Sequence, residues 1–176
     1  MPASLIVGVE KQVSFAEILI ATHDVLWRLL KCKSVPSLLW KHSEGSAFEK
    51  GYSAMTWSLD NTFPSTYVKY EGDDIEDSLV SLFSFYGFKR RLLLSCCAEA
   101  RTAASNALTA ALSIAAAEVL GSLIEDAAHH WISKDVYLPN ELIEKLSLKT
   151  PAPDFKAGLD LMYKSQAIHH RYPLKS

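Results

Sequence analysis

The sequence predicts an α+β fold that is predominantly helical, in which a small antiparallel β-hairpin or sheet packs on a helical layer. Three observations lead to this prediction. An alanine-rich stretch from Ala98 to Trp131 contains no proline and favours one long helix. Apolar residues at helical spacing precede and follow that stretch. Period-two alternation, the pattern of a half-buried strand, is confined to a short region between Ala47 and Tyr70.

The long alanine-rich helix is expected to lie at the centre of the fold. It is apolar around most of its circumference, and a narrow polar side carries Thr102, Asn106, Thr109 and Ser113. Such a helix is expected to be buried on several sides, either in the middle of a helical layer or between that layer and a sheet. A membrane span is the alternative, but Glu118 within the apolar window would cost roughly 3 kcal/mol in hydrocarbon. The buried helix is therefore favoured.

Composition predicts one cytoplasmic domain, with a mixed β/α part over 1–72 and a helical part over 73–170. The chain has 176 residues and a formal net charge of −2, which gives no reason to expect attraction to nucleic acid or membranes. The three cysteines, Cys32, Cys96 and Cys97, are odd in number and lack CxxC spacing. They are therefore expected to be reduced thiols. The N-terminus has no basic region, so no signal peptide is expected.

The first elements are predicted from local signals. Ser4 to Gln12 is expected to form a short strand. Ser14 and Glu17 have the spacing of a capping box, which should open a helix that ends near Cys32. The apolar face of that helix should consist of Phe15, Ile18, Leu19, Thr22, Val25, Leu26, Leu29 and Leu30.

A hairpin is predicted between Ala47 and Tyr70. Met55, Trp57 and Leu59 alternate with smaller residues, and β-forming residues resume from Thr66. Trp40, Trp57 and Tyr70 are candidates for exposed contact residues, although core or hairpin packing is the favoured interpretation.

A second helix is predicted from Gly72 to Gly87, with Ile75, Leu79, Leu82, Phe83 and Tyr86 on its apolar face. The following segment, Phe88 to Cys97, could form a helical turn or a short buried strand. Helix is favoured because both neighbouring segments are predicted to be helical.

Two shorter helices are predicted near the C-terminus. Pro139 suits the first turn of a helix that reaches Leu148. Pro151 and Pro153 should break the chain, and Asp154 should cap a last helix. That helix would bury Phe155, Leu159, Met162 and Tyr163.

No catalytic residues, metal site or cofactor are expected. The pairs Glu125/His129 and Asp126/His130 have i, i+4 spacing, but a metal needs more ligands, so ion pairing is favoured. Cys96 could act as a nucleophile if its thiol pKa were lowered by Arg90, Arg91 or Arg101. No orienting partner is identifiable, so a core role is favoured.

The densest charge cluster is acidic and consists of Glu71, Asp73, Asp74, Glu76 and Asp77. It either complements the positive end of a helix or forms a contact surface for a basic partner. The leading hypothesis is a cytoplasmic, non-enzymatic protein-binding module of the inhibitor, immunity-type or adaptor kind. A homodimer with a seam of Ala107, Ala111 and Ala115 on the long helix is a further hypothesis. Nucleic-acid and membrane binding are not expected.

The segment from Lys164 to His169 resembles the Arg-x4-6-His motif of the HEPN family, which lies late in a helical bundle after a long helix rich in small residues. Lys164 takes the place of the arginine. The resemblance implies a helical ribonuclease or an RNA- or nucleotide-binding protein. It also implies an inactive relative as an option, because lysine lacks the bidentate fork of arginine. This is the alternative to the protein-binding hypothesis.

Overall fold

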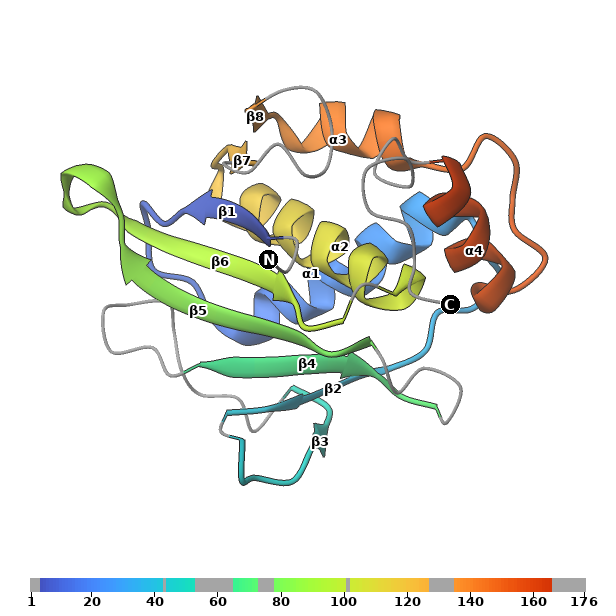
Figure 1. Cartoon of the computed structure of the whole chain (residues 1–176), viewed down its shortest axis with the longest axis horizontal. Coiled ribbons are helices and arrows are strands. Elements are labelled where there is room, and N and C mark those ends of the chain that lie inside the picture. The colour runs from blue at the N-terminus through green and yellow to red at the C-terminus, as the bar shows by residue number, and fades with distance from the viewer. Residues whose placement is uncertain are drawn as a thin grey trace.

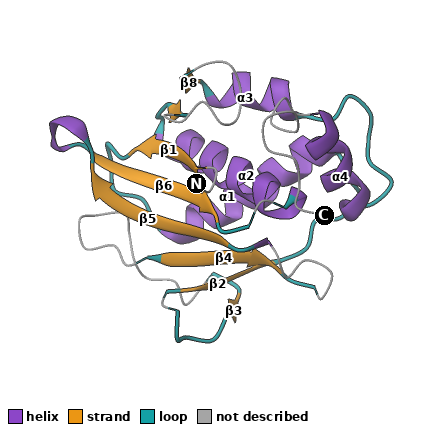
Figure 2. Ribbon diagram, viewed as in Figure 1, coloured by secondary structure: helices purple, strands orange, loops and turns teal. Residues whose placement is uncertain are grey.

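The computed structural model describes residues 4–42, 44–52, 65–72, 78–100, 102–126 and 135–165. Within these ranges, eight strands form one antiparallel sheet, and four helices gather on one of its faces (Figures 1 and 2). The strands are β1 (Ser4–Gly8), β2 (Leu38–Lys41), β3 (Glu49–Lys50), β4 (Thr66–Tyr70), β5 (Val80–Tyr86), β6 (Leu92–Ala98), β7 (Ile124–Glu125) and β8 (Val136–Tyr137). The helices are α1 (Phe15–Leu30), α2 (Ala103–Leu120), α3 (Pro139–Leu146) and α4 (Phe155–Ser165).

The sheet corrects the predicted fold class. Its strand order is β3-β2-β4-β5-β6-β1-β7-β8, and the fold is 42% helical and 26% strand. The protein is therefore a mixed α+β fold around a large sheet, and the prediction of a predominantly helical fold with a small hairpin was wrong. The same finding contradicts the helical bundle that the HEPN resemblance implied.

Every strand of the sheet alternates between two faces. The inner face, against the helices, carries the buried residues Leu5, Val7, Leu38, Trp40, Thr66, Val68, Tyr70, Val80, Leu82, Leu94, Cys96, Ala98, Ile124 and Tyr137. The registers agree across neighbouring strands, since Leu82 is opposite Cys96 and Cys96 is opposite Leu5. Trp40 and Tyr70 are thus core residues, as favoured from the sequence, and are not exposed contacts.

The largest error concerns the two central strands, β5 and β6. Residues 80–86 were predicted to be the second half of a helix, and 88–97 were assigned to helix in preference to strand. Both form strands, joined through a short 3-10 turn (Phe88–Arg90). β6 pairs with β5 on one side and with β1 on the other. The pairing of β6 with β1 joins residues far apart in sequence, and this long-range burial overrides the local helical pattern.

Helix α1 forms as predicted. Ser14 Oγ accepts from the Glu17 amide at 3.3 Å, and the Ser14 amide donates to Glu17 Oε2 at 2.9 Å. This is the predicted capping box. The eight residues predicted for the apolar face are the buried residues of α1. The helix ends at Leu30 because Lys31 adopts the left-handed conformation with φ of 50°.

Helix α2 is central but shorter than predicted. It ends at Leu120 because Gly121 adopts a left-handed conformation with φ of 69°, and the Ser122 amide donates to the Ala117 carbonyl oxygen at 2.9 Å. The predicted helix also began too early, because Ala98 belongs to β6 and α2 starts at Ala103. After Leu120 the chain turns into β7, and 127–131 lie outside the described residues. By length and composition α2 could cross a membrane, as many core helices could, but 78% of it is buried inside the fold. The polar side is buried too, including Thr109 and Ser113.

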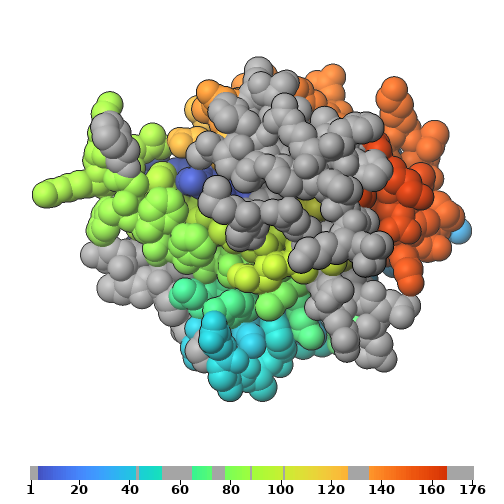
Figure 3. Space-filling view, in the orientation of Figure 1, coloured from blue at the N-terminus to red at the C-terminus, as the bar shows by residue number. Residues whose placement is uncertain are grey.

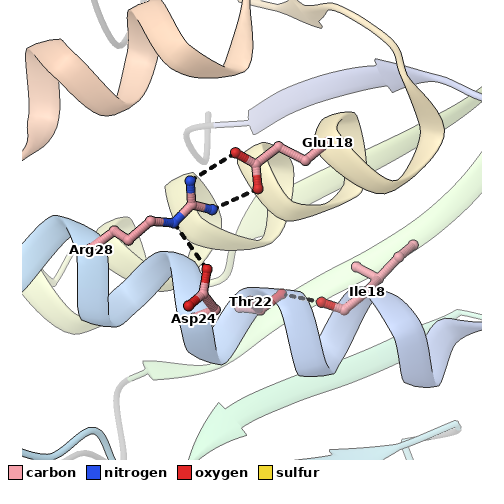
Figure 4. A network of polar contacts seen from close by, with 5 residues as sticks. All are labelled: Ile18, Thr22, Asp24, Arg28 and Glu118. Carbon is pink, nitrogen blue, oxygen red and sulfur yellow. Dashed lines mark hydrogen bonds and ion pairs between the residues drawn. The ribbon is translucent and has the colours of Figure 1, made fainter.

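An ionic clamp joins α1 to α2 (Figure 4). Arg28 donates from Nη1 and Nη2 to the two carboxylate oxygens of Glu118, at 2.9 and 2.6 Å. Arg28 Nε also lies 3.0 Å from Asp24 Oδ2, one turn earlier on α1. The hydrogen bonds to Glu118, partly offset by burial, raise the pKa of Arg28 above its ordinary value. The bidentate geometry fixes the rotation of α1 relative to α2.

The two C-terminal helices pack on α1 and α2. Pro139 begins α3, and Asp154 Oδ1 accepts from the Ala157 amide at 2.8 Å at the start of α4, both as predicted. The Leu148 amide donates to the carbonyl oxygen of Leu29, which ties the segment between these helices to the end of α1. The predicted strand at Met55–Leu59 lies outside the described residues.

Tyr70 provides a test of this packing. Its ring is 1% exposed and lies edge-on to Phe155, with centroids 4.9 Å apart. Among the residues that the structure describes, its hydroxyl has no hydrogen-bond partner, and burial raises the pKa of Tyr70 well above 10. Tyr70→Phe should therefore raise the free energy of unfolding by about 1 kcal/mol, because it removes an unsatisfied buried hydroxyl.

Urea titration of the wild type and of Tyr70→Phe measures this effect. Tyr52→Phe is the matched control, because the Tyr52 hydroxyl forms a hydrogen bond with the backbone of Leu38. Removing that hydroxyl should lower the free energy of unfolding. A loss of stability in Tyr70→Phe as large as that in Tyr52→Phe would contradict the assignment.

Candidate functional site

The outer face of the sheet, opposite the helices, is the candidate site. We use this name for the outward side chains of β1, β2, β4, β5 and β6. Its larger members are Ile6, Leu39, Lys41, Tyr67, Lys69, Phe83, Phe85 and Leu93, all half-buried. The four described helices lie on the other side of the sheet (Figure 2). Two ring contacts agree with this placement, since α4 and α3 reach the inner-face residues Tyr70 and Tyr137.

The centre of the outer face is apolar. Phe83 and Phe85 lie on the same side of β5, with ring centroids 5.8 Å apart. Cross-strand pairing places Leu93 beside Phe85, and Ser95 beside Phe83. A solvated sheet face normally carries polar residues at such positions. A contiguous apolar patch there is typical of a contact surface.

Small polar side chains lie beside these apolar residues on the same face. Ser81 is opposite Cys97, and Ser95 lies between Phe83 on β5 and Ile6 on β1. Ser95 is only 3% exposed because its larger neighbours flank it. Ser95 Oγ and Cys97 Sγ are 3.3 Å apart. On the outer face, small polar side chains therefore lie beside larger aromatic side chains.

Lysines rim the outer face at β2 and β4. Lys41 Nζ lies 4.9 Å from the centroid of the Phe48 ring and 5.4 Å from that of Tyr67. Lys69 Nζ lies 4.6 Å from the centroid of Phe48. Cation–π contacts of this kind hold both ammonium groups over the sheet. The side chains of Lys41 and Lys69 are thus held in place by aromatic rings, and they give this edge of the outer face two positive charges.

One of the predicted acidic residues, Glu71, lies directly after β4. Glu71, the first of the predicted acidic binding residues, pairs with Lys50 Nζ at 2.8 Å. Its amide donates to the Ser37 carbonyl oxygen, so this hydrogen bond extends the pairing of β4 with β2 by one residue. The other predicted binding residues, Asp73, Asp74, Glu76 and Asp77, lie outside the described residues. The acidic surface therefore stays a prediction.

Cys96 faces the core. It is fully buried beneath α2, and burial raises its pKa from 9.0 to about 12, while a hydrogen bond with Ser113 lowers it slightly. Cys97, on the outer face, has a pKa raised by burial and lowered by hydrogen bonds with Ser95 and Ser4. Both thiols are protonated at neutral pH, which is the opposite of what a cysteine nucleophile needs. Arg101 lies outside the described residues.

The basic run Lys89-Arg90-Arg91 lies at the exposed turn between β5 and β6, which projects at the left of Figure 3. Lys89 and Arg90 adopt left-handed conformations, with φ of 67° and 56°. Arg91 reaches back to Glu10 at 3.5 Å. The turn is therefore separate from the outer face.

The remaining sequence-predicted sites do not assemble in the described part of the chain. Glu125 belongs to strand β7, so the predicted helical pairing with His129 was wrong. His129, His130 and His169 lie outside the described ranges. Searched over the described residues, the structure shows no cluster of three His, Cys, Asp or Glu side chains that could hold a metal. The alanine seam proposed for a homodimer, Ala107, Ala111 and Ala115, is buried inside the fold and offers no surface.

No family model, no curated protein and no solved structure matches this chain.

Sequence reasoning missed the outer face because it treated 80–97 as helical. A helix would place Leu82 and Phe83 together on one apolar side, whereas a strand sends them to opposite faces. The signal that could have found the site is the β-forming composition of residues 80–86, which hold one valine and three aromatic residues in seven positions. Lys41 was missed because β2 is only four residues long and was not predicted. Lys69 lies in the predicted strand from Thr66, but its partner strand β2 was not predicted beside it.

Proposed function

We propose that the protein is a protein-binding module of the inhibitor, immunity-type or adaptor kind, and that its partner docks on the outer face of the sheet. The single observation that supports this is the apolar centre of the outer face, at positions where a solvated face would be polar. Phe83 and Phe85 would be the main contacts, because aromatic residues contribute much of the energy of protein interfaces.

The lysine rim gives the partner a chemical character. Lys41 and Lys69 are held over aromatic rings, so they lose little side-chain freedom when a carboxylate binds them. The partner is expected to present an apolar centre with carboxylates facing these two lysines. The acidic run 71–77, of which the structure describes only residues 71 and 72, stays a separate proposal for basic groups on the same partner.

Replacing Phe83 and Phe85 by threonine should abolish partner capture while the fold is retained. Threonine keeps a high strand propensity, and both rings are outside the core. We expect the double variant to weaken binding at least about 30-fold, the effect of losing roughly 2 kcal/mol. The measurement is affinity capture from the cells that make the protein, followed by titration calorimetry with the captured protein after purification.

Tyr86→Thr is the matched control for this experiment. Tyr86 is 60% exposed, lies on the same strand β5 and points to the other side of it. Its replacement should leave the affinity unchanged. Equal loss in Tyr86→Thr, or full affinity in the Phe83/Phe85 variant, would show that the outer face is not the binding surface.

A further inference from the structure

Helix α1 carries an exposed apolar pair away from the outer face. Ile20 is 59% exposed and Trp27 is 56% exposed. They are two helical turns apart, so both side chains lie on one side of the helix. Exposed tryptophan is costly in water and is enriched in the central contacts of protein interfaces. This pair is therefore a candidate contact surface for a partner.

The charges on the same side of α1 are arranged with opposite signs at the two ends. Glu17 is exposed one turn before Ile20, and Lys31, the C-cap residue, is exposed one turn after Trp27. A surface that is acidic at one end and basic at the other, with an apolar pair between, is complementary to itself when it is reversed. Such a surface suits an isologous two-fold interface.

We infer that this side of α1 docks antiparallel on the same side of α1 in a second copy of the chain. A two-fold axis near Asp24 places Ile20 of one copy against Trp27 of the other. The same axis brings Glu17 near Lys31 of the second copy. Each contact occurs twice in the dimer, once on each side of the axis.

The ionic clamp of Figure 4 prepares α1 for this docking. Arg28 binds Glu118 through two hydrogen bonds, so α1 is held on α2 with Ile20 and Trp27 outward. In the proposed dimer, two negatively charged Asp24 side chains approach each other at the axis, and the clamp reduces this repulsion. Arg28 Nε lies 3.0 Å from Asp24 Oδ2 and offsets that charge in each copy.

Sedimentation equilibrium measures the dimer directly. The wild type should dimerise with a dissociation constant on the order of 10 μM, as expected for a small interface. Trp27→Lys and Ile20→Glu, each alone, should weaken self-association at least about 30-fold. Leu161→Lys is the control, because Leu161 is 44% exposed on α4, outside the proposed interface, and its change should leave the dimer intact.

Mixing the two disruptive variants tests the antiparallel arrangement. In a mixed dimer, one side of the axis keeps the native Ile20–Trp27 contact, and the other pairs the introduced glutamate with the introduced lysine. The mixture should therefore form heterodimers, detected by labelling one variant with a fluorophore. No arrangement that brings Trp27 against Trp27 would give this recovery.

Circular dichroism and thermal melting of each variant establish that the folds are equivalent before association is compared. A wild type that stays monomeric at every concentration overturns the inference, and so does a dimer that Trp27→Lys leaves unchanged. A mixture that remains monomeric overturns the antiparallel docking. Binding of a different protein through Trp27 by a monomeric wild type would assign this side of α1 to another partner and would equally overturn self-docking.

Discussion

Ala111→Asp is expected to lower the free energy of unfolding by about 4 kcal/mol, a large part of the total stability of a domain this size. Ala111 lies in the middle of α2 and is completely buried. A carboxylate there would have no cationic partner and no water. Most of the protein should be unfolded or aggregated at 37 °C, as measured by circular dichroism and urea titration.

Ala104→Asp is the control for this prediction. Ala104 belongs to the first turn of the same helix and is only half-buried. A carboxylate at that end complements the helix dipole, so stability should stay within about 1 kcal/mol of the wild type. If Ala111→Asp were tolerated as well as Ala104→Asp, the core of α2 would have to face solvent.

The second large effect is a loss of stability at alkaline pH through Cys96. Burial raises the pKa of this thiol in the native state to about 12, from 9.0. Between these values the unfolded chain releases the proton and the native protein keeps it, so the free energy of unfolding falls as pH rises. A difference of three pH units corresponds to about 4 kcal/mol, lost progressively from pH 9 to 12. Below pH 9 this thiol contributes no pH dependence.

Urea titrations at pH 8, 9 and 10 measure the slope, and the difference between wild type and Cys96→Ala isolates this thiol because Tyr70 titrates in both proteins. Cys96→Ala should be less stable than the wild type at pH 8, because a small cavity remains, but should lose less stability by pH 10. Cys97→Ala is the control, since that thiol is only half-buried and its replacement should flatten the curve less. Equal slopes in wild type and Cys96→Ala would contradict the burial of the thiol.

Elements with strong local signals could be predicted from the sequence. The capping box at Ser14 and the apolar face after it define α1, and Pro139 and Asp154 mark the starts of α3 and α4. These signals act within one or two turns of chain, so they do not depend on the rest of the fold. The burial of α2 followed from its composition in the same way.

The sheet could not be predicted in the same way, because its strands are defined by distant partners. β1 begins the chain, yet it pairs with β6, some ninety residues later. Residues 80–86 contain β-forming residues but no clean period of two, and the acidic run before them favoured helix. The end of α2 at Gly121 was missed for a different reason. Gly121 was assumed to lie inside the helix, where packing would offset its low helix propensity, whereas it ends the helix.

The candidate site could not be predicted from the sequence either, because it depends on the sheet. The outer face exists only once β5 and β6 are strands, because only then do Phe83, Phe85 and Leu93 share a surface. The lysine rim needs two further strands, β2 and β4, to come together. Neither cluster is contiguous in the sequence. The acidic run 71–77, which is contiguous, was the surface that sequence reasoning could find.

The central claim is that α2 forms the interior of one cooperative fold, with the inner face of the sheet packed against it. Amide hydrogen exchange of the native protein tests it most directly. The amides from Ala107 to Ala117 should be among the slowest, with free energies of opening close to that of global unfolding. Exchange in this segment as fast as in the edge strands β3 and β8 would contradict the claim.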